Sequence, residues 1–236
     1  MNVMVRQHST PSLLGTGFYT VPEASRLLKI PSRNLSRWLG GYSHQKNGEK
    51  TQIPPLWTPQ LPRLDQYIEL GFRDLIELRF IQAFIKTGLG LKTIRHCLEH
   101  ARECVDDDRP FSTRRFQTDG QTIFLDTLKQ SGGEQLLDLK QQQYVLRGLI
   151  ERTFKDLDIE ADTVVRWRPF NGKDSIVVDP ARAFGQPITT HDGVPTVALA
   201  EAVEAEGSIE RAARIYDVNP AVVRDAVKFE EFLKVA

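Results

Sequence analysis

A cluster of side chains that can donate hydrogen bonds lies at residues 32–37, which read SRNLSR. Arg33 and Asn34 carry the guanidinium and amide groups that make two-point hydrogen bonds with guanine and adenine edges in the major groove of DNA. Leu35 and Trp38 are spaced so that they share one face of a helix, which leaves the polar side chains on the opposite face. The segment therefore predicts a helix whose outer face can read bases.

Contacts with phosphate would come from basic side chains around this helix. Arg26 precedes it, and His44, Lys46 and Lys50 follow it. Cations near phosphates supply affinity that is independent of sequence, whereas donors to base edges supply specificity. The full set of side chains that we expect to contact DNA is Arg26, Ser32, Arg33, Asn34, Ser36, Arg37, His44, Lys46 and Lys50.

Two short helices with a tight turn between them would position these donors. Thr20 can cap the first helix, and Glu23 completes a capping box three residues later. Pro31 ends this helix, because the residue before a proline avoids helical backbone angles. Ser32 is expected to cap the second helix. The arrangement predicted is a helix-turn-helix.

The segment 43–57 contains Asn47-Gly48, a strong signal for a two-residue hairpin turn. Lys46 and Lys50 flank the turn, and apolar residues return toward the core after it. One interpretation is a wing that offers its basic side chains to a phosphate backbone; the alternative is a solvated surface hairpin. Its position directly after a helix-turn-helix favours the wing.

The 236 residues have a formal net charge of zero, but the charges are unevenly distributed along the chain. Residues 1–105 carry a net charge of +6 and residues 158–236 a net charge of −5. A basic front suits a phosphate partner, whereas an acidic back suits a different one. The last three predicted helices are mostly acidic on their exposed faces, so we expect them to bind protein or to dimerise.

The fold class expected is mainly α with short β-hairpins. The front is a winged helix-turn-helix, the middle is α+β, and the end is a three-helix unit with a small hairpin. Predicted helices are 72–87, 91–105, 134–156, 197–206 (capped by Thr196), 209–216 and 221–234. Predicted strands are 164–170, 176–178 and 187–189, with a further hairpin at 111–128 that turns at Asp119-Gly120. The predicted domains are a flexible arm (1–17), a DNA-binding domain (18–105), a middle linker or dimerisation segment (106–172) and a C-terminal unit (173–236).

The sequence contains few signals for a metal site or for a catalytic site. Cys97, His100 and Cys104 would lie on one side of a helix, but ligands two turns apart do not easily hold one ion, so buried cysteines are the preferred interpretation. The histidines have no catalytic spacing and no nucleotide-binding glycine loop is present, so an enzyme is the least favoured class. We expect no metal or cofactor. Without a signal peptide or a long apolar run, the chain is expected to be cytoplasmic.

Residues 18–105 resemble the MerR-like winged-helix group. The likeness rests on the segment 19–24 (YTVPEA), on the Arg37-Trp38 pair, and on the segment that follows the predicted wing, FRDLIELRFIQAFIKTGLGLKTIR. In that group an arginine followed by an aromatic residue grips phosphate, so the resemblance implies this role for Arg37 as an alternative to base reading. The wing is longer than usual, and the long dimerising coiled coil of the group is not visible here.

Residues 175–235 resemble a small antitoxin domain formerly known only as a domain of unknown function. The matching segments are 178–180 (VDP), 184–187 (FGQP), 194–196 (VPT) and 213–216, leading to 223–230. Proteins that join these two parts resemble VapB-type antitoxins. The resemblance implies a homodimer that binds operator DNA to regulate its own transcription and neutralises a PIN-like ribonuclease toxin.

Two further points follow from this interpretation. Arg166 and Arg168 are candidates for contact with an acidic toxin site, by charge alone. The alternative function is a stand-alone MerR-like transcription regulator whose middle segment senses a small molecule. Phe111, Phe116 and Phe124, with Trp167, could line such a pocket, although core packing is the default expectation for them.

Overall fold

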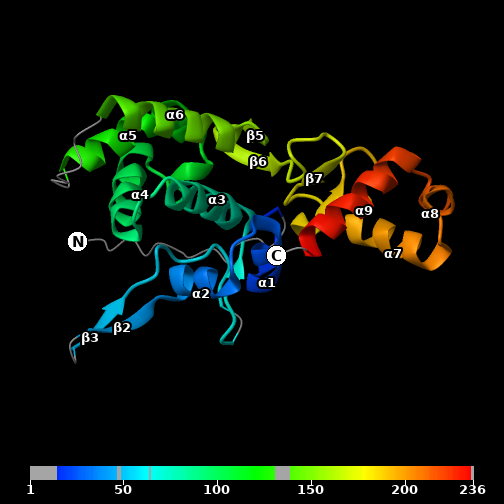
Figure 1. Ribbon diagram of the computed structural model, residues 1–236, viewed down its shortest axis with the longest axis horizontal. Coiled ribbons are helices and arrows are strands. Elements are labelled where there is room, and N and C mark those ends of the chain that lie inside the picture. Colours follow the sequence, from blue (N-terminus) through cyan, green and yellow to red (C-terminus); the bar gives the residue numbers. More distant parts are fainter. Residues whose placement is uncertain (1–14, 47–48, 64, 131–138, 235–236) are drawn as a thin grey trace, which may run out of the picture.

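The computed structural model describes residues 15–46, 49–63, 65–130 and 139–234, and it is mainly helical with short antiparallel sheets, as the sequence predicts (Figure 1). The helices are α1 (Val21–Leu28), α2 (Ser32–Gly40), α3 (Phe72–Lys86), α4 (Leu91–Val105), α5 (Arg114–Gln130), α6 (Leu139–Phe154), α7 (Thr196–Glu206), α8 (Ile209–Tyr216) and α9 (Pro220–Lys234). The strands are β1 (Tyr19–Thr20), β2 (Tyr42–Lys46), β3 (Glu49–Ile53), β4 (Glu69–Leu70), β5 (Leu157–Glu160), β6 (Thr163–Trp167), β7 (Ile176–Val178) and β8 (Pro187–Thr189). Short 3-10 turns occur at Pro110–Ser112 and Ala183–Gly185.

Helices α1 and α2 form the expected pair. The Thr20 side chain accepts from the backbone N–H of Glu23, and the Glu23 carboxylate accepts from the Thr20 N–H at 2.8 Å, which completes the capping box. Lys29 adopts a left-handed conformation and ends α1. The prediction that Ser32 caps α2 is wrong: Pro31 occupies the cap position with no side-chain hydrogen bond, and Ser32 is the first helical residue. Proline suits a helix start because its φ is fixed near the helical value.

The hairpin that follows α2 is formed by β2 and β3, which pair in register from Tyr42 opposite Ile53 to Lys46 opposite Glu49. This register confirms a two-residue connection. The predicted turn residues, Asn47 and Gly48, lie outside the described residues. Leu56 and Trp57 are buried just after the hairpin, as expected, so the chain returns to the core at this point.

A cluster of phenylalanines forms the centre of the main core. The ring of Phe80 on α3 lies between 4.9 and 6.2 Å, centroid to centroid, from the rings of Phe84, Phe111, Phe116 and Phe154. The rings of Phe80, Phe84, Phe111 and Phe116 are all fully buried. The aromatic residues of the middle segment therefore pack against one another as core, which is the default expectation for them.

The predicted hairpin at 111–128 is wrong, because residues 114–130 form helix α5. Asp119 and Gly120 lie within this helix and do not form a turn. Phe116, Gly120 and Phe124 recur at helical spacing and are buried; the two rings pack against Phe80 and Phe84 of α3, and α5 contacts α4. Burial of these rings outweighs the preference of an Asp-Gly pair for turns.

The middle and the end of the chain share one antiparallel sheet, with strand order β5-β6-β7-β8. Strand β6 is shorter than the predicted 164–170, and β5 was missed because the chain turns directly from α6 into it. Trp167 of β6 pairs with Val178 of β7, across the predicted domain boundary at residue 172. The domain division itself remains a prediction.

Helices α6 to α9 lie close to their predicted ranges, except that residues 134–138 of the predicted helix 134–156 lie outside the described residues. Ser208 caps α8 as expected. Thr196 does not cap α7: Pro195 holds the cap position, and the Thr196 hydroxyl donates to the Glu230 carboxylate on α9. Helices α7, α8 and α9 enclose a small separate apolar cluster of Leu199, Ala212, Ala213, Val218, Val223 and Ala226.

Helix α9 lies next to α1 (Figure 1), so residues near the start and near the end of the described chain contact each other there. The Tyr19 hydroxyl donates to the Gly185 carbonyl at 2.7 Å, and the Phe18 N–H donates to the Phe184 carbonyl at 2.9 Å. The Lys29 ammonium lies 4.3 Å from the centre of the Phe232 ring. The front of the chain is thus anchored to its end by buried and exposed contacts.

Candidate nucleic-acid interface

The outer face of α2 carries the predicted donors. Leu35, Trp38 and Leu39 are buried, which fixes the orientation of the helix. On the other side of α2 the side chains of Ser32, Arg33 and Ser36 are exposed, and those of Asn34 and Arg37 are half-buried. The structure therefore groups these five predicted residues on one helix and leaves their polar groups accessible.

Arg37 has a contact that the sequence did not predict. Its guanidinium carbon lies 4.0 Å from the centre of the Tyr42 ring, at the start of β2. A guanidinium stacked on an aromatic ring keeps its N–H groups free at the edges of its plane while its position is fixed. The contact joins α2 to the hairpin and presents a preorganised cation between them.

The hairpin separates two of the predicted basic residues. His44 is opposite Thr51, and Lys50 is opposite Gln45, the neighbour of His44. Residues directly opposite each other point to the same face of a strand pair, and neighbours along a strand point to opposite faces. His44 therefore shares a face with Tyr42, and Lys50 points to the other face. Both side chains are exposed, and the side chain of Lys46 lies outside the described residues.

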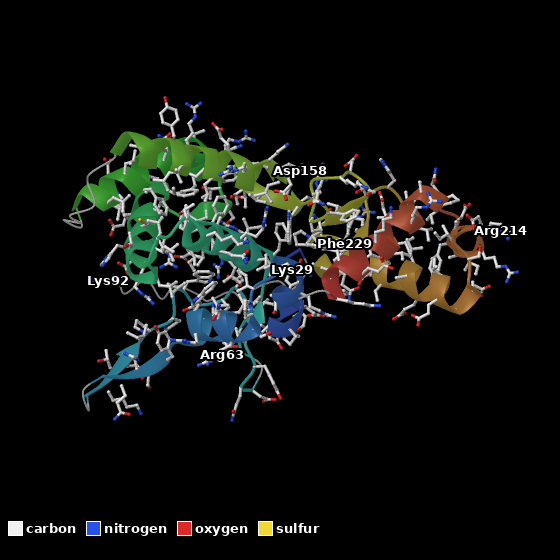
Figure 2. The ribbon with its side chains drawn as sticks, in the orientation of Figure 1. Lys29, Arg63, Lys92, Asp158, Arg214 and Phe229 are labelled. Atoms are coloured by element: carbon white, nitrogen blue, oxygen red, sulfur yellow. The ribbon has the colours of Figure 1, made fainter. Side chains whose placement is uncertain are left out.

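Three basic residues missed by the sequence analysis lie near the hairpin and α2. Arg63 is exposed, with one guanidinium nitrogen 3.9 Å from the position that a Cβ on Gly40 would occupy. Lys92 lies at the end of α4 nearer the hairpin (Figure 2). Arg95 donates to the carbonyls of Pro54 and Pro55, both at 2.8 Å, and so holds the segment after the hairpin. Lone basic residues in a loop or on a helix carry no local signal, so only the tertiary structure shows these placements.

A buried carboxylate also fixes the base of the hairpin. Asp74 on α3 accepts from the Trp57 indole N–H at 2.9 Å, from the Gln60 backbone N–H at 2.8 Å and from the Arg109 guanidinium at 2.8 Å. Asp74 is fully buried, so its charge is balanced by these donors at the place where the chain leaves the hairpin. The hairpin is consequently held against a rigid helix.

Arg26 lies apart from this surface. It is exposed on α1 and lines a hollow with Phe18, Pro187 and Glu230, between α1 and the C-terminal helices. The structure thus places Arg26 beside the end of the chain, although the sequence analysis grouped it with the phosphate contacts.

Arg166 and Arg168 already have partners within the chain. Arg166 pairs with Asp158 at 3.2 Å and with Glu160, and Arg168 pairs with Asp158 at 2.5 Å and with Asp174 at 3.0 Å. These hydrogen bonds raise the pKa of Arg168 above its ordinary value, so its charge is permanent. Both arginines form a surface network across β5 and β6.

Helix α4 carries both cysteines of the chain, one buried and one partly buried. Cys97 is fully buried, and burial raises the pKa of its thiol to about 12. The Cys104 sulfur lies 3.6 Å from Nε2 of His100. Among the described residues, no group of three His, Cys, Asp or Glu side chains is arranged to hold a metal ion. Within the same part of the chain, no helix combines the length and the apolar character that crossing a membrane requires.

Comparison with known proteins adds a likeness over nearly the whole chain. No protein-family model matches the sequence. A Mycobacterium tuberculosis protein named "Putative antitoxin VapB45" is 26% identical over 220 residues, which cover 89% of this chain and 92% of that protein. The crystal structure of Rv2018 from Mycobacterium tuberculosis superposes with a TM-score of 0.68 at 23% identity, over 89% of this chain and 96% of that chain. The second likeness shows that the two chains share a fold.

Proposed function

We propose that the chain is the antitoxin of a type II toxin-antitoxin system. The observation that carries this proposal is the likeness to a protein named as an antitoxin over nearly the full length of both chains. The name of that relative implies a toxin partner, and the resemblance of the C-terminal segment to a small antitoxin domain points to a PIN-like ribonuclease as that toxin. The chain would act in the cytoplasm.

The proposal includes binding to operator DNA by a MerR-like winged helix-turn-helix, formed by α1, α2 and the β2–β3 hairpin. Arg33 and Asn34 would read base edges, and Arg37, stacked on Tyr42, would contact phosphate. Lys50 or His44 would contact the flanking backbone, because only one face of the hairpin can meet a duplex. A homodimer would place two such helices on a pseudo-palindromic operator.

The DNA part can be tested with two arginine variants. Arg33→Ala should weaken binding to the chain's own promoter about tenfold to a hundredfold and relax sequence preference, because a base contact contributes about 1–3 kcal/mol. Arg211→Ala removes the same charge from exposed α8 and should leave binding unchanged. Equal losses for both variants would show that only total charge matters, which contradicts base reading by α2.

Neutralisation can be tested by co-expressing the chain with the protein encoded by the neighbouring gene. The antitoxin proposal is supported if the neighbouring protein stops cell growth when it is expressed by itself, but not when it is co-expressed with this chain, and if the two proteins co-purify. If the chain binds promoter DNA but neither binds nor neutralises that neighbour, the stand-alone regulator is the better description.

Arg166 and Arg168 remain a proposed contact with the toxin's acidic site. Insertion of either arginine would first break its ion pairs with Asp158, Glu160 or Asp174. Their double replacement by alanine should abolish inhibition if they enter that site, and full inhibition by the double variant would remove them from the proposal.

A further inference from the structure

A groove runs along the outer side of the C-terminal unit, between α7 and α9. It encloses about 330 Å³ and is lined by Val197, Ala200, Glu201, Val203, Glu204, Val227, Glu230, Glu231 and Lys234. The lining residues of α9, at positions 227, 230, 231 and 234, form one continuous stripe along that helix. On α7, positions 197, 200, 201 and 204 repeat the same spacing. Two parallel stripes therefore face a common channel.

The lining combines an apolar floor with an acidic rim. Valine and alanine side chains form the floor, and the Val197 side chain is 45% exposed. Glu201, Glu204 and Glu231 are exposed on the two rims, and Lys234 is the one basic residue among the lining residues given above. A field of one sign above an exposed apolar surface is typical of a protein interaction site.

The groove continues toward α1. A second hollow of about 210 Å³ shares Val197 and Glu230 with it and is lined on the far side by Phe18, Glu23 and Leu27. Phe18 is 41% exposed there. The apolar floor thus extends from the C-terminal unit to the first helix of the chain, where Glu23, which caps α1, and Arg26 line the hollow as a pair of opposite charges.

Folding of the C-terminal unit does not account for this surface. Its own core is built from Leu199, Ala212 and Val223 with their neighbours, which lie on the inner sides of the three helices. Of the floor residues, Val203 packs against that core, whereas Val197 and Ala200 are not part of it, and the side chains of the rim glutamates are exposed. An exposed valine beside several carboxylates does not stabilise a monomer, so the surface is better explained by a partner.

We propose that this groove docks a basic amphipathic segment of the partner protein, which under the proposed function is the toxin. The segment would place aliphatic or aromatic side chains on the apolar floor and lysine or arginine side chains against Glu201, Glu204 and Glu231. A nucleic acid would not fit, because its phosphates would face carboxylates. A second copy of this chain that docked through the same groove would not fit either, because its acidic rim would face the acidic rim of the first copy.

The experiment compares two charge reversals on one helix. Glu204→Lys and Glu206→Lys change the same charge at exposed positions of α7, but the two residues lie about 200° apart around the helix, and only Glu204 lines the groove. Binding of each purified variant to the neighbouring gene's protein is measured by calorimetry. We expect Glu204→Lys to weaken the complex about tenfold, and the double variant Glu204→Lys/Glu231→Lys about a hundredfold, with Glu206→Lys unchanged.

The outcomes separate the inference from the proposed function. If the unmodified chain does not bind its neighbour, the antitoxin proposal fails. If it binds and neutralises but Glu204→Lys/Glu231→Lys binds equally well, or Glu206→Lys weakens binding equally, the groove assignment alone is overturned. Folding of each variant is checked by its thermal transition. Val197→Asp tests the apolar floor separately, because it places a charged side chain where an apolar side chain of the partner would pack, and it should also weaken binding.

Photo-crosslinking from Ala200→Cys identifies the occupant directly. Labelling of a toxin segment with basic residues on one side and apolar residues on the other supports the proposal. Labelling of residues 1–14 of the same chain, or of a second copy, would show that the groove serves an internal or self contact and would overturn it.

Discussion

Replacement of Tyr19 by phenylalanine tests the contact that anchors the front of the chain to its end. The hydroxyl of Tyr19 donates to the carbonyl oxygen of Gly185 at 2.7 Å, and the side chain is 2% exposed. The two residues are far apart in sequence, so the hydrogen bond closes a long loop. An alanine Cβ at Gly185 would lie 2.2 Å from the hydroxyl oxygen, which shows how tightly the ring and this turn are packed.

The expected loss follows from leaving one buried acceptor without its donor. Tyr19→Phe keeps the ring, so no cavity larger than one oxygen atom forms. An unsatisfied buried carbonyl costs about 1–3 kcal/mol, and we expect the free energy of unfolding to fall by this amount. Burial, with smaller effects of Asp179 and Glu23, raises the pKa of Tyr19 far above its ordinary value, so the hydroxyl stays protonated and the loss should be the same at about pH 6 and about pH 9.

Urea denaturation followed by tryptophan fluorescence measures this difference, because Trp38, Trp57 and Trp167 are all buried. Tyr67→Phe is the matched control, since Tyr67 is 74% exposed. If the change for Tyr19→Phe were no larger than that for Tyr67→Phe, the hydrogen bond to Gly185 would not anchor the N-terminal segment to the C-terminal part of the chain.

Two further predictions concern buried positions. Burial raises the pKa of Glu77 to about 8, so the folded state binds an extra proton between about pH 4.5 and about pH 8 and loses stability as the pH rises through that range. Glu77→Gln should therefore stabilise the protein by a few kcal/mol at about pH 9 and little at about pH 5, as measured by urea denaturation at both pH values; an equal effect at both would contradict the assignment. Gly120→Ala should destabilise by about 1–3 kcal/mol because its Cβ would lie 2.9 Å from the buried Phe116 ring, whereas Gly148→Ala in α6, with open space around it, should stabilise by about 0.5–1 kcal/mol. Thermal unfolding of the two variants measures these opposite shifts, and a gain for both would show that the Phe116 ring can move.

The long helices were predictable because their signals are local and redundant. Helices α3 and α4 each have an apolar stripe; glycines flank α3 on both sides and precede α4, and both helices lie within a residue of their predicted ranges. Helix α5 was not predicted, because Asp119-Gly120 is a strong turn signal and the residues around it predict a hairpin. What decided its structure was burial against α3, a tertiary effect that no short window of sequence contains.

The candidate site was predictable only in part. The donors of α2 follow from a helical pattern, and the structure groups them as expected. The separation of His44 and Lys50 onto opposite faces could also have been derived, because a two-residue turn at 47–48 fixes the register of the hairpin. The ion pairs of Arg166, by contrast, depend on how β5 meets β6, and the sequence analysis did not predict β5.

Helix α1 gives the two proposed binding surfaces a physical connection. Its inner side, with Ala24 and Leu28, packs in the core beside α2, whereas Glu23 and Leu27 line the hollow that continues the acidic groove. A segment docked in that groove and reaching into the hollow would therefore contact the helix that packs beside α2, the proposed DNA-reading helix. If docking shifts or stiffens α1, bound toxin changes the affinity for operator DNA, and bound operator changes the affinity for toxin by the same factor, because coupling between two sites is reciprocal. The coupling is measured as the ratio of operator affinities with and without bound toxin, and as the ratio of toxin affinities with and without operator. If both ratios are equal in the unmodified chain and both fall to one in Glu204→Lys/Glu231→Lys, the coupling originates in the groove.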